Sequence, residues 1–192
     1  MRSQELVHML AERCPAQGRF VLGIDGPDAA GKTTLAEAVG DLLGPRAVRA
    51  SIDGFHRPAA VRHAVPYENG FDVERLASGL LRPFRVGAGE VLVRAYDHVA
   101  DAPREAVSRV AADAVLVLDG VFLGQVQPEL DLWVFLEVPP EVTLSRAAAR
   151  DADFQEVLYR ERYLPAQARY RPTVRADVVV DNSDPASPRL VP

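Results

Sequence analysis

One short segment near the start of the sequence has the residue types and spacing that bind a chain of phosphates. It reads G-x-x-x-x-G-K-T, and with the residue that follows it consists of Gly26, Pro27, Asp28, Ala29, Ala30, Gly31, Lys32, Thr33 and Thr34. Glycines let the backbone wrap around phosphates, and successive N–H groups at a helix start supply partial positive charge. The alternative, a chance glycine-rich turn, would not require a strand before the motif and a helix after it.

The lysine of this motif is the only lysine in the chain. The sequence has 22 basic residues, and all except Lys32 are arginines. A compact ammonium on a flexible stem can reach between the β- and γ-phosphates, whereas a guanidinium is planar and wider. We therefore expect Lys32 to bind nucleotide phosphates and Thr33 to hold Mg²⁺ through its hydroxyl group.

Two aspartates follow apolar runs at positions where a parallel sheet binds its ligands. Asp53 closes the run "AVRASID", and Asp119 closes "AVLVLD". Ligands of such sheets bind outside the carboxyl ends of the strands. Asp53 could there take the proton of an acceptor hydroxyl, and Asp119 could hold Mg²⁺ or its waters. The alternative for both is an aspartate that caps a turn or a helix.

Two arginines have the spacing of neighbours on a helix. Arg146 and Arg150 lie four residues apart in "LSRAAARD" and so share one helix face. Two guanidinium groups on one face could close over a transferring phosphoryl group and stabilise its charge. A solvated surface pair explains the spacing equally well.

The elements that must position these residues follow an alternating pattern of short apolar runs and helical stretches, which is typical of a parallel sheet covered on both faces. Strands are expected at residues 19–25, 47–53, 90–97, 113–122, 130–138 and 176–182. Helices are expected at residues 32–43, 73–81 and 140–170, the last broken near 151–154. Arg94 is expected to face outward from its strand. The sequence therefore predicts an α/β fold, a P-loop three-layer sandwich with a mostly parallel sheet. One domain should span residues 1–192, with a small helical lid at about 146–160 and a loose tail at about 183–192.

The composition is that of a soluble globular protein, with 48% hydrophobic and 26% charged residues. A net charge of −5 argues against a nucleic-acid partner, which usually requires a basic face. The single cysteine, Cys14, excludes a disulfide framework and a cysteine-based metal site. The N-terminal segment fits neither a signal peptide nor a membrane span, so we expect a cytoplasmic protein without a membrane partner. The sequence leaves open whether the chain forms a homo-oligomer.

A phosphate loop alone does not separate kinases, GTPases and ATPase motors. A GTPase would need an N-K-x-D motif, yet the only lysine already lies in the phosphate loop. Motor ATPases usually have longer chains and further domains. A kinase that uses ATP and Mg²⁺ to phosphorylate a small molecule fits a chain of 192 residues.

Taken together, the motifs resemble those of the uridine kinase-like P-loop kinases, a group that includes phosphoribulokinase and bacterial pantothenate kinase. The resemblance covers residues 19–181. "SIDGFHR" resembles the segment with the catalytic base, which implies that role for Asp53. "GFD" and "AYDHV" resemble acceptor-binding segments, which implies substrate contacts for Asp72 and Tyr96. "VLVLDGVF" and "LSRAAARD" resemble the metal-binding strand end and the start of the lid.

The sequence also departs from this family where the acceptor would bind. His56 stands where the family has a tyrosine, the T-H-S-R run after the Y-D-F segment is replaced by "ADAP", and the lid is shorter. His56 and Arg57 follow the expected base and are candidates for the acceptor pocket. A nucleoside such as uridine is the leading acceptor. The alternatives are a sugar, a vitamin precursor such as pantothenate, or a catalytically inactive nucleotide-binding regulator.

Overall fold

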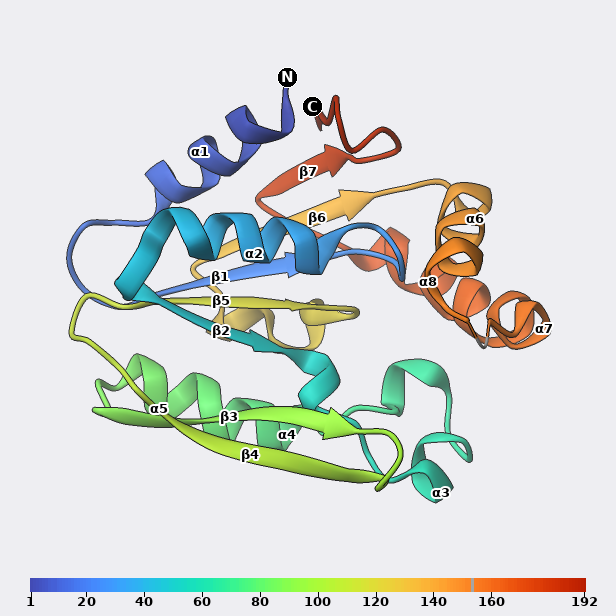
Figure 1. Ribbon diagram of the computed structural model, residues 1–192, viewed down its shortest axis with the longest axis horizontal. Coiled ribbons are helices and arrows are strands. Elements are labelled where there is room, and N and C mark those ends of the chain that lie inside the picture. The colour runs from blue at the N-terminus through green and yellow to red at the C-terminus, as the bar shows by residue number, and fades with distance from the viewer. Residues whose placement is uncertain (153) are drawn as a thin grey trace.

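A six-stranded sheet forms the centre of the protein, as the computed structural model shows for residues 1–152 and 154–192 (Figure 1). The strand order is β2-β5-β1-β6-β7-β8, in which the first five strands are parallel and β8 is antiparallel to β7. This arrangement confirms the predicted α/β fold with a mostly parallel sheet. The strands are β1 (Phe20–Asp25), β2 (Ala47–Ser51), β5 (Val115–Gly120), β6 (Leu132–Glu137), β7 (Val178–Asp181) and β8 (Arg189–Val191).

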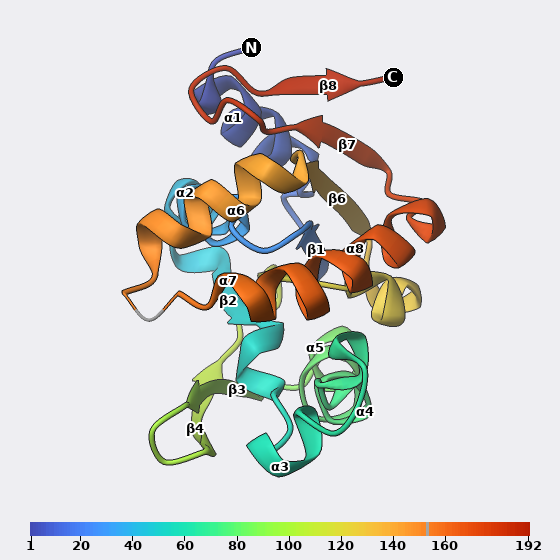
Figure 2. The same cartoon turned by 90° about the vertical axis from the view of Figure 1, so that its right-hand side faces the viewer.

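Helices cover both faces of this sheet. The helices α1 (Ser3–Arg13) and α2 (Lys32–Leu43) pack on one face. The other face is covered by a continuous helical segment and by the helix that leads into β7 (Figure 2). The first consists of α4 (Val73–Leu76), a π-helical turn (Ala77–Leu81) and α5 (Arg82–Arg85), and the second is α8 (Leu164–Tyr170).

The unbroken apolar run of β5 follows from these two layers. Val115 and Val117 point into the core beneath α1 and α2, whereas Leu116 and Leu118 point into the core on the opposite face. Each of these side chains is fully buried. Because both faces are covered, no position along the strand is left for a polar side chain until Asp119, at the carboxyl end.

A separate antiparallel hairpin packs beside the sheet. It consists of β3 (Glu90–Asp97) and β4 (Ala102–Arg109). The sequence predicts the first strand, but β4 has mostly exposed residues and no apolar alternation that would have indicated it. The expectation that Arg94 faces outward was wrong. Only 9% of its side chain is exposed, because it pairs with Glu105 and lies over the Phe55 ring.

Two further segments differ from the sequence prediction. β2 ends at Ser51, and Asp53 lies in the 3₁₀ turn Ile52–Phe55 because the Ser51 hydroxyl accepts a hydrogen bond from the Asp53 N–H and starts the turn. The segment expected to be a loose tail, residues 183–192, ends in β8, which covers the outer edge of β7.

The expected lid consists of short helices near the end of the chain. α6 (Pro140–Arg150) ends where the sequence predicts a break, and α7 (Glu156–Leu158) then continues through a π-helical turn (Tyr159–Tyr163) into α8. Asp153, within that break, lies outside the described residues. A short helix, α3 (Ala59–Arg62), lies below the sheet near the tip of the hairpin. Within the described residues, no helix is long and apolar enough to cross a membrane.

Candidate active site

The predicted phosphate loop joins β1 to α2, in the strand-then-helix setting that the motif requires. Gly31 precedes the helix with φ of 93°, a left-handed conformation that favours glycine. Gly26 opens the loop with φ of 150°, and a Cβ added there would lie 2.6 Å from the Leu136 carbonyl oxygen. Only glycine fits this close approach. Both glycines are therefore required by the backbone path of the loop.

Lys32 lies at the first position of α2, and its side chain turns back into the loop. The side chain is almost fully buried, and Nζ donates a hydrogen bond to the Pro27 carbonyl oxygen at 2.6 Å. A buried ammonium at the start of a helix adds its full charge to the partial charge of the loop N–H groups. The loop is therefore suited to an anion with several oxygens.

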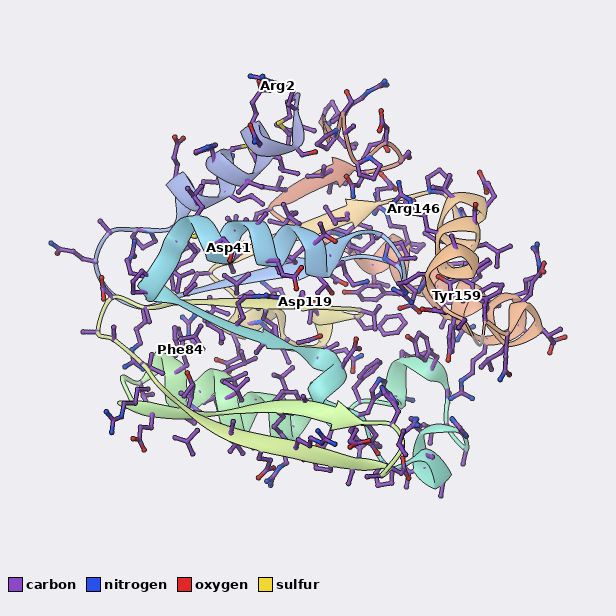
Figure 3. The ribbon with its side chains drawn as sticks, in the orientation of Figure 1. Arg2, Asp41, Phe84, Asp119, Arg146 and Tyr159 are labelled. Carbon is purple, nitrogen blue, oxygen red and sulfur yellow. The ribbon has the colours of Figure 1, made fainter. Side chains whose placement is uncertain are left out.

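The two residues predicted to hold a metal contact each other. Thr33 Oγ1 donates to Asp119 Oδ2 at 2.8 Å, and Ser51 Oγ lies 3.5 Å from the same carboxylate oxygen. Burial raises the pKa of Asp119, while the Thr33 hydrogen bond and the Lys32 charge act in the opposite direction. A hydroxyl and a carboxylate side by side suit Mg²⁺, which takes one or two protein oxygens and completes its shell with water and phosphate. Figure 3 labels Asp119 on β5.

Asp53 lies next to this pair and borders two hollows. One is a shallow hollow that Thr33 and Asp119 also line. The other, which we call the Asp53 cleft, has a volume of about 340 Å³. Its walls come from the phosphate loop, the segment after β2, the tip of the hairpin and the helices between α6 and α8. A single carboxylate therefore borders both the metal-binding pair and a cleft large enough for a small molecule.

The surroundings of Asp53 disfavour its charged form. Exclusion of water by the surrounding protein, followed by the nearby Asp28 carboxylate, raises the pKa of Asp53 to about 6, although the Lys32 charge acts in the opposite direction. The side chain still keeps 67% of its surface open to the cleft, so water weakens this effect until a ligand fills the cleft. A carboxylate with a raised pKa is a stronger base than an ordinary aspartate.

The predicted acceptor residues separate into two groups. His56 lines the Asp53 cleft, with Nε2 3.8 Å from Asp53 Oδ1, and burial lowers its pKa to about 4. Arg57 and Asp72 do not line it. Their side chains approach each other at 4.0 Å, and Asp72 caps α4 by accepting a hydrogen bond from a backbone N–H. Tyr96 lines the shallow hollow, where its hydroxyl donates to Asp101 at 2.8 Å.

The two predicted lid arginines point to different partners even though they share a helix face. Arg146 donates to the carbonyl oxygens of Asn182 and Ser183 at 2.9 and 2.8 Å, in the loop after β7. Arg150 lines the Asp53 cleft and forms a bidentate pair with Asp151. Of the two, only Arg150 reaches the cleft; Figure 3 labels Arg146 on α6.

The segment after β2 is fastened to the helices that follow the lid. Arg162 donates to the carbonyl oxygens of Arg62, His63 and Val65. A second contact is the stacking of Tyr163 on Tyr67, with ring centroids 4.3 Å apart. An ion pair between Arg169 of α8 and Glu68, at 3.1 Å, adds a third contact. We call residues 62–68 the acceptor segment.

A fully buried carboxylate lies directly before the phosphate loop. Asp25 accepts hydrogen bonds from the Gly26 N–H at 2.7 Å, the Tyr170 hydroxyl at 2.5 Å and the Trp133 indole N–H at 3.2 Å. The Tyr170 hydroxyl itself accepts a hydrogen bond from the Gly124 N–H. Burial raises the pKa of Asp25 to about 6, and the hydrogen bond from Tyr170 opposes the shift most strongly. This network joins the start of the phosphate loop to α8.

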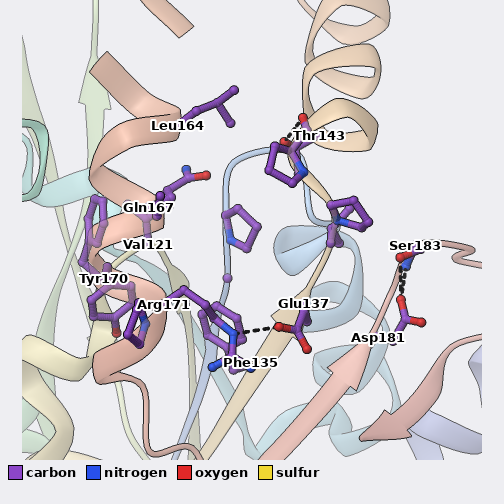
Figure 4. A pocket seen from close by; sticks show the side chains of 18 of the residues that line it. Val121, Phe135, Glu137, Thr143, Leu164, Gln167, Tyr170, Arg171, Asp181 and Ser183 are labelled. Carbon is purple, nitrogen blue, oxygen red and sulfur yellow. Dashed lines mark hydrogen bonds and ion pairs between the residues drawn. The ribbon is translucent and has the colours of Figure 1, made fainter. Parts of the chain in front are cut away.

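A second cavity lies on the other side of the phosphate loop, between α6 and α8 (Figure 4). It has a volume of about 590 Å³ and mostly apolar walls. Arg171 and Glu137 form an ion pair of 2.8 Å along one side, and Gln167 points into the space. Among the described residues, Gly26 and Pro27 are the only predicted site residues that line it. Of the predicted catalytic side chains, Asp53 and Arg150 line the Asp53 cleft, and none of them lines this cavity.

No protein-family model matches the sequence. Among solved structures, a protein from Bacillus stearothermophilus named as a possible uridine kinase is 26% identical with a TM-score of 0.72, over 92% of this chain and 97% of that one. A protein from Silicibacter sp. TM1040, named provisionally as a fructose transport system kinase, is 22% identical with a TM-score of 0.74, over 93% and 98% of the two chains. A D-glycerate 3-kinase from Cryptococcus neoformans var. grubii is 10% identical with a TM-score of 0.65, over 98% and 99%.

The chain has the fold of the uridine kinase-like P-loop kinases. The likeness extends over nearly the full length of this chain and of each of these structures. Their names cover three different small molecules, so the kinase fold alone does not select an acceptor.

Several residues of the kinase site carried no signal in the sequence that would have placed them there. Asp28 occupies a position at which the phosphate-loop motif does not specify the residue type, yet its side chain lines the Asp53 cleft. Tyr67 and Tyr163 have no distinguishing spacing and meet only through the fold. The one signal in the sequence was the residue type of Asp28, because an aspartate brings a negative charge into a loop that is predicted to bind phosphates.

Proposed function

We propose that this protein is an ATP- and Mg²⁺-dependent kinase that phosphorylates a hydroxyl group of a small molecule. The observation that carries the proposal is the position of Asp53. Its side chain borders both the hollow with Thr33 and Asp119 and the Asp53 cleft. Phosphoryl transfer needs this order of parts, in which a base lies between the bound phosphates and the acceptor.

The residues of the phosphate loop would bind the donor. Backbone N–H groups of the loop after Pro27 would surround the phosphates, and the Lys32 ammonium would neutralise charge that develops on the oxygens during transfer. Thr33 and Asp119 would hold Mg²⁺, which offsets the charge of the phosphates when it is bound. Their 2.8 Å contact supports this role, since it brings the two oxygens that would hold the ion close together.

Asp53 would act on the acceptor. The hydroxyl oxygen of the acceptor forms a bond to the γ-phosphorus as the bond to the β-phosphate oxygen breaks, and the hydroxyl proton passes to the Asp53 carboxylate. The products are a phosphate ester and ADP. Arg150 at the wall of the cleft is placed to stabilise the transferring group, and residues 146–160 would form the lid over it.

A nucleoside is the leading acceptor, by resemblance to the uridine kinase-like sequences. A sugar or another small polyol is the second candidate, and one observation favours it. Asp101, from the "ADAP" segment, is bonded to Tyr96, to Arg62 and to the Ala59 N–H. These contacts engage the hydroxyl of Tyr96, which the resemblance to uridine kinases would place beside a nucleobase. A cytoplasmic location, where ATP is abundant, is part of the proposal.

The proposal is tested by measuring ADP release from ATP and Mg²⁺ across a panel of nucleosides, sugars and vitamin precursors. We expect at least one compound to raise ADP release well above the rate without acceptor, and the Lys32→Ala variant to abolish the increase. If ATP binds but no compound raises the rate, the protein is a nucleotide-binding regulator. If ATP with Mg²⁺ does not raise the melting temperature, the phosphate loop does not bind nucleotide.

A further inference from the structure

The phosphate loop contributes a carboxylate to the Asp53 cleft. Asp28 is the third residue of the loop, and its half-buried side chain lines the cleft on the side of Asp53. The Tyr67 hydroxyl donates to Asp28 Oδ2 at 3.0 Å and so fixes its orientation. Among the described residues, Asp28 Oδ1 has no hydrogen-bond partner. One carboxylate oxygen therefore remains available to a molecule in the cleft.

The positive side chains in the cleft are already engaged by the protein. Arg150 is paired with Asp151 at 2.7 and 2.8 Å, and Arg62 is paired with Asp101 at 3.0 Å. Arg162 donates to three carbonyl oxygens of the acceptor segment. Because burial lowers the pKa of His56 to about 4, its imidazole is neutral at pH 7. Two of the three arginines therefore have their charge balanced by aspartates, whereas Arg162 keeps its charge and directs its N–H groups to backbone carbonyl oxygens.

We propose that Asp28 binds a hydroxyl group of the acceptor and that the kinase selects uncharged polyhydroxylated acceptors over anionic ones. The inference rests on the proposed kinase function and adds to it the substrate class and the residue that selects it. Asp28 Oδ1 accepts a hydrogen bond from a hydroxyl other than the one that reacts at Asp53. A hydroxyl bonded to a carboxylate makes a charge-assisted hydrogen bond, which is stronger than a neutral one.

The same carboxylate disfavours an acceptor that carries its own negative charge. An anionic acceptor in the cleft would lie beside the carboxylates of Asp28 and Asp53 and would also face the phosphates of the donor. The N–H groups of Arg162 are directed to the acceptor segment and not to a ligand in the cleft. Unpaired like charges in a partly buried cleft are costly, and they supply specificity by repulsion. An uncharged acceptor gains the hydrogen bond to Asp28 without this electrostatic repulsion.

Matched acceptor pairs that differ by one charged group test this inference. The pairs are pantothenol with pantothenate, gluconamide with gluconate, and uridine with orotidine (6-carboxyuridine), in which the charged group leaves the hydroxyl that would react in place. For each pair that is phosphorylated, we expect the wild-type kcat/KM to be at least about 100-fold higher for the uncharged member. In the Asp28→Asn variant the KM of the uncharged acceptor should rise about tenfold or more, and the preference should fall at least about tenfold. The dissociation constant of ATP should not rise, because Lys32 and the N–H groups of the loop are kept and the substitution removes a negative charge near the phosphates.

The Tyr67→Phe variant is the matched control. It removes the hydrogen bond to Asp28 but keeps the carboxylate, so KM should rise modestly while the preference for uncharged acceptors is kept. Melting temperatures of both variants verify that they fold. The inference is wrong if the wild type prefers anionic members, or if Asp28→Asn phosphorylates both members as the wild type does. If the wild type phosphorylates another compound of the panel but no member of any pair, this inference fails and the kinase proposal stands. If it binds ATP and phosphorylates no compound at all, the kinase proposal fails and the inference fails with it.

Discussion

The buried Asp25 carboxylate makes stability depend on pH in a predictable way. Its pKa is raised from 3.8 to about 6 in the folded protein, because the side chain is fully removed from water. A raised folded pKa means that the native state holds its proton more tightly than the unfolded chain does. The stabilisation from this proton is complete below the unfolded pKa and is lost as the pH rises through about 6. At about 1.4 kcal/mol per factor of ten, the full loss is about 3 kcal/mol.

The Asp25→Asn variant isolates this contribution. An asparagine cannot ionise, so the free energy of unfolding of the variant relative to the wild type should increase with pH. Between about pH 4 and pH 8 the increase should be about 2.5 kcal/mol, most of it below pH 6. The asparagine amide also changes the hydrogen bonds with Tyr170 and Trp133. The prediction therefore concerns how the stability difference between variant and wild type changes with pH, and not its sign at one pH.

Urea unfolding measured by tryptophan fluorescence is the direct assay. Trp133 is the only tryptophan of the chain, and its indole N–H donates to Asp25. Its native-state fluorescence should therefore also titrate with a midpoint near the pKa of Asp25 in the wild type and not in the variant. Asp41→Asn, on the exposed side of α2, is the matched control. A stability difference between Asp25→Asn and wild type that stays constant across this pH range would refute the reasoning.

Three further predictions concern the proposed chemistry. Lys32→Arg should lower kcat more than about tenfold in an ADP-release assay although the positive charge is kept. The reason is that the Lys32 side chain is buried in the loop, where a compact ammonium fits and a guanidinium does not. Retention of more than a tenth of the wild-type kcat would contradict this prediction. Thr33→Ala should remove the Mg²⁺-dependent part of the rise in melting temperature caused by ATP, and an unchanged rise would exclude Thr33 as a metal ligand. Asp53→Asn should lower kcat by about 10²–10⁴ while calorimetry finds ATP affinity within a few-fold. In the wild type, kcat should fall as the pH drops below about 6, where Asp53 in the filled cleft becomes protonated. Loss of ATP binding in the Asp53→Asn variant would instead indicate that Asp53 is a metal ligand or has a structural role.

The sequence predicts those parts of the site that depend on local pattern. The phosphate loop could be recognised because the glycines and Lys32 must occupy fixed positions between a strand and a helix. Asp119 could be placed because it ends a strand that is buried on both faces. These features depend on backbone geometry and burial, which leave a signal in consecutive residues.

Other parts of the site depend on contacts between distant segments and leave no such signal. Asp25 and Tyr170 are 145 positions apart, and their hydrogen bond exists only because α8 returns to the phosphate loop. Helix spacing correctly puts Arg146 and Arg150 on one face, yet the loop after β7 captures the first of them. The spacing of residues along a helix predicts the face from which a side chain leaves the helix. The hydrogen-bond partner of a long side chain depends on which carbonyl or carboxylate oxygen the fold brings near it.

The attachment of α8 to the acceptor segment has a thermodynamic consequence for the two substrates. Arg162, Tyr163 and Arg169 hold residues 62–68 against the helix that leads out of the lid. If residues 146–160 close over ATP as the proposed lid, these contacts would move the wall of the Asp53 cleft with it, so that each ligand would favour the same closed arrangement. Reciprocity requires the acceptor to strengthen ATP binding by the same factor by which ATP strengthens binding of the acceptor. Such coupling would make the closed, reactive arrangement most populated when both substrates are bound, which would limit the wasteful transfer of phosphate to water.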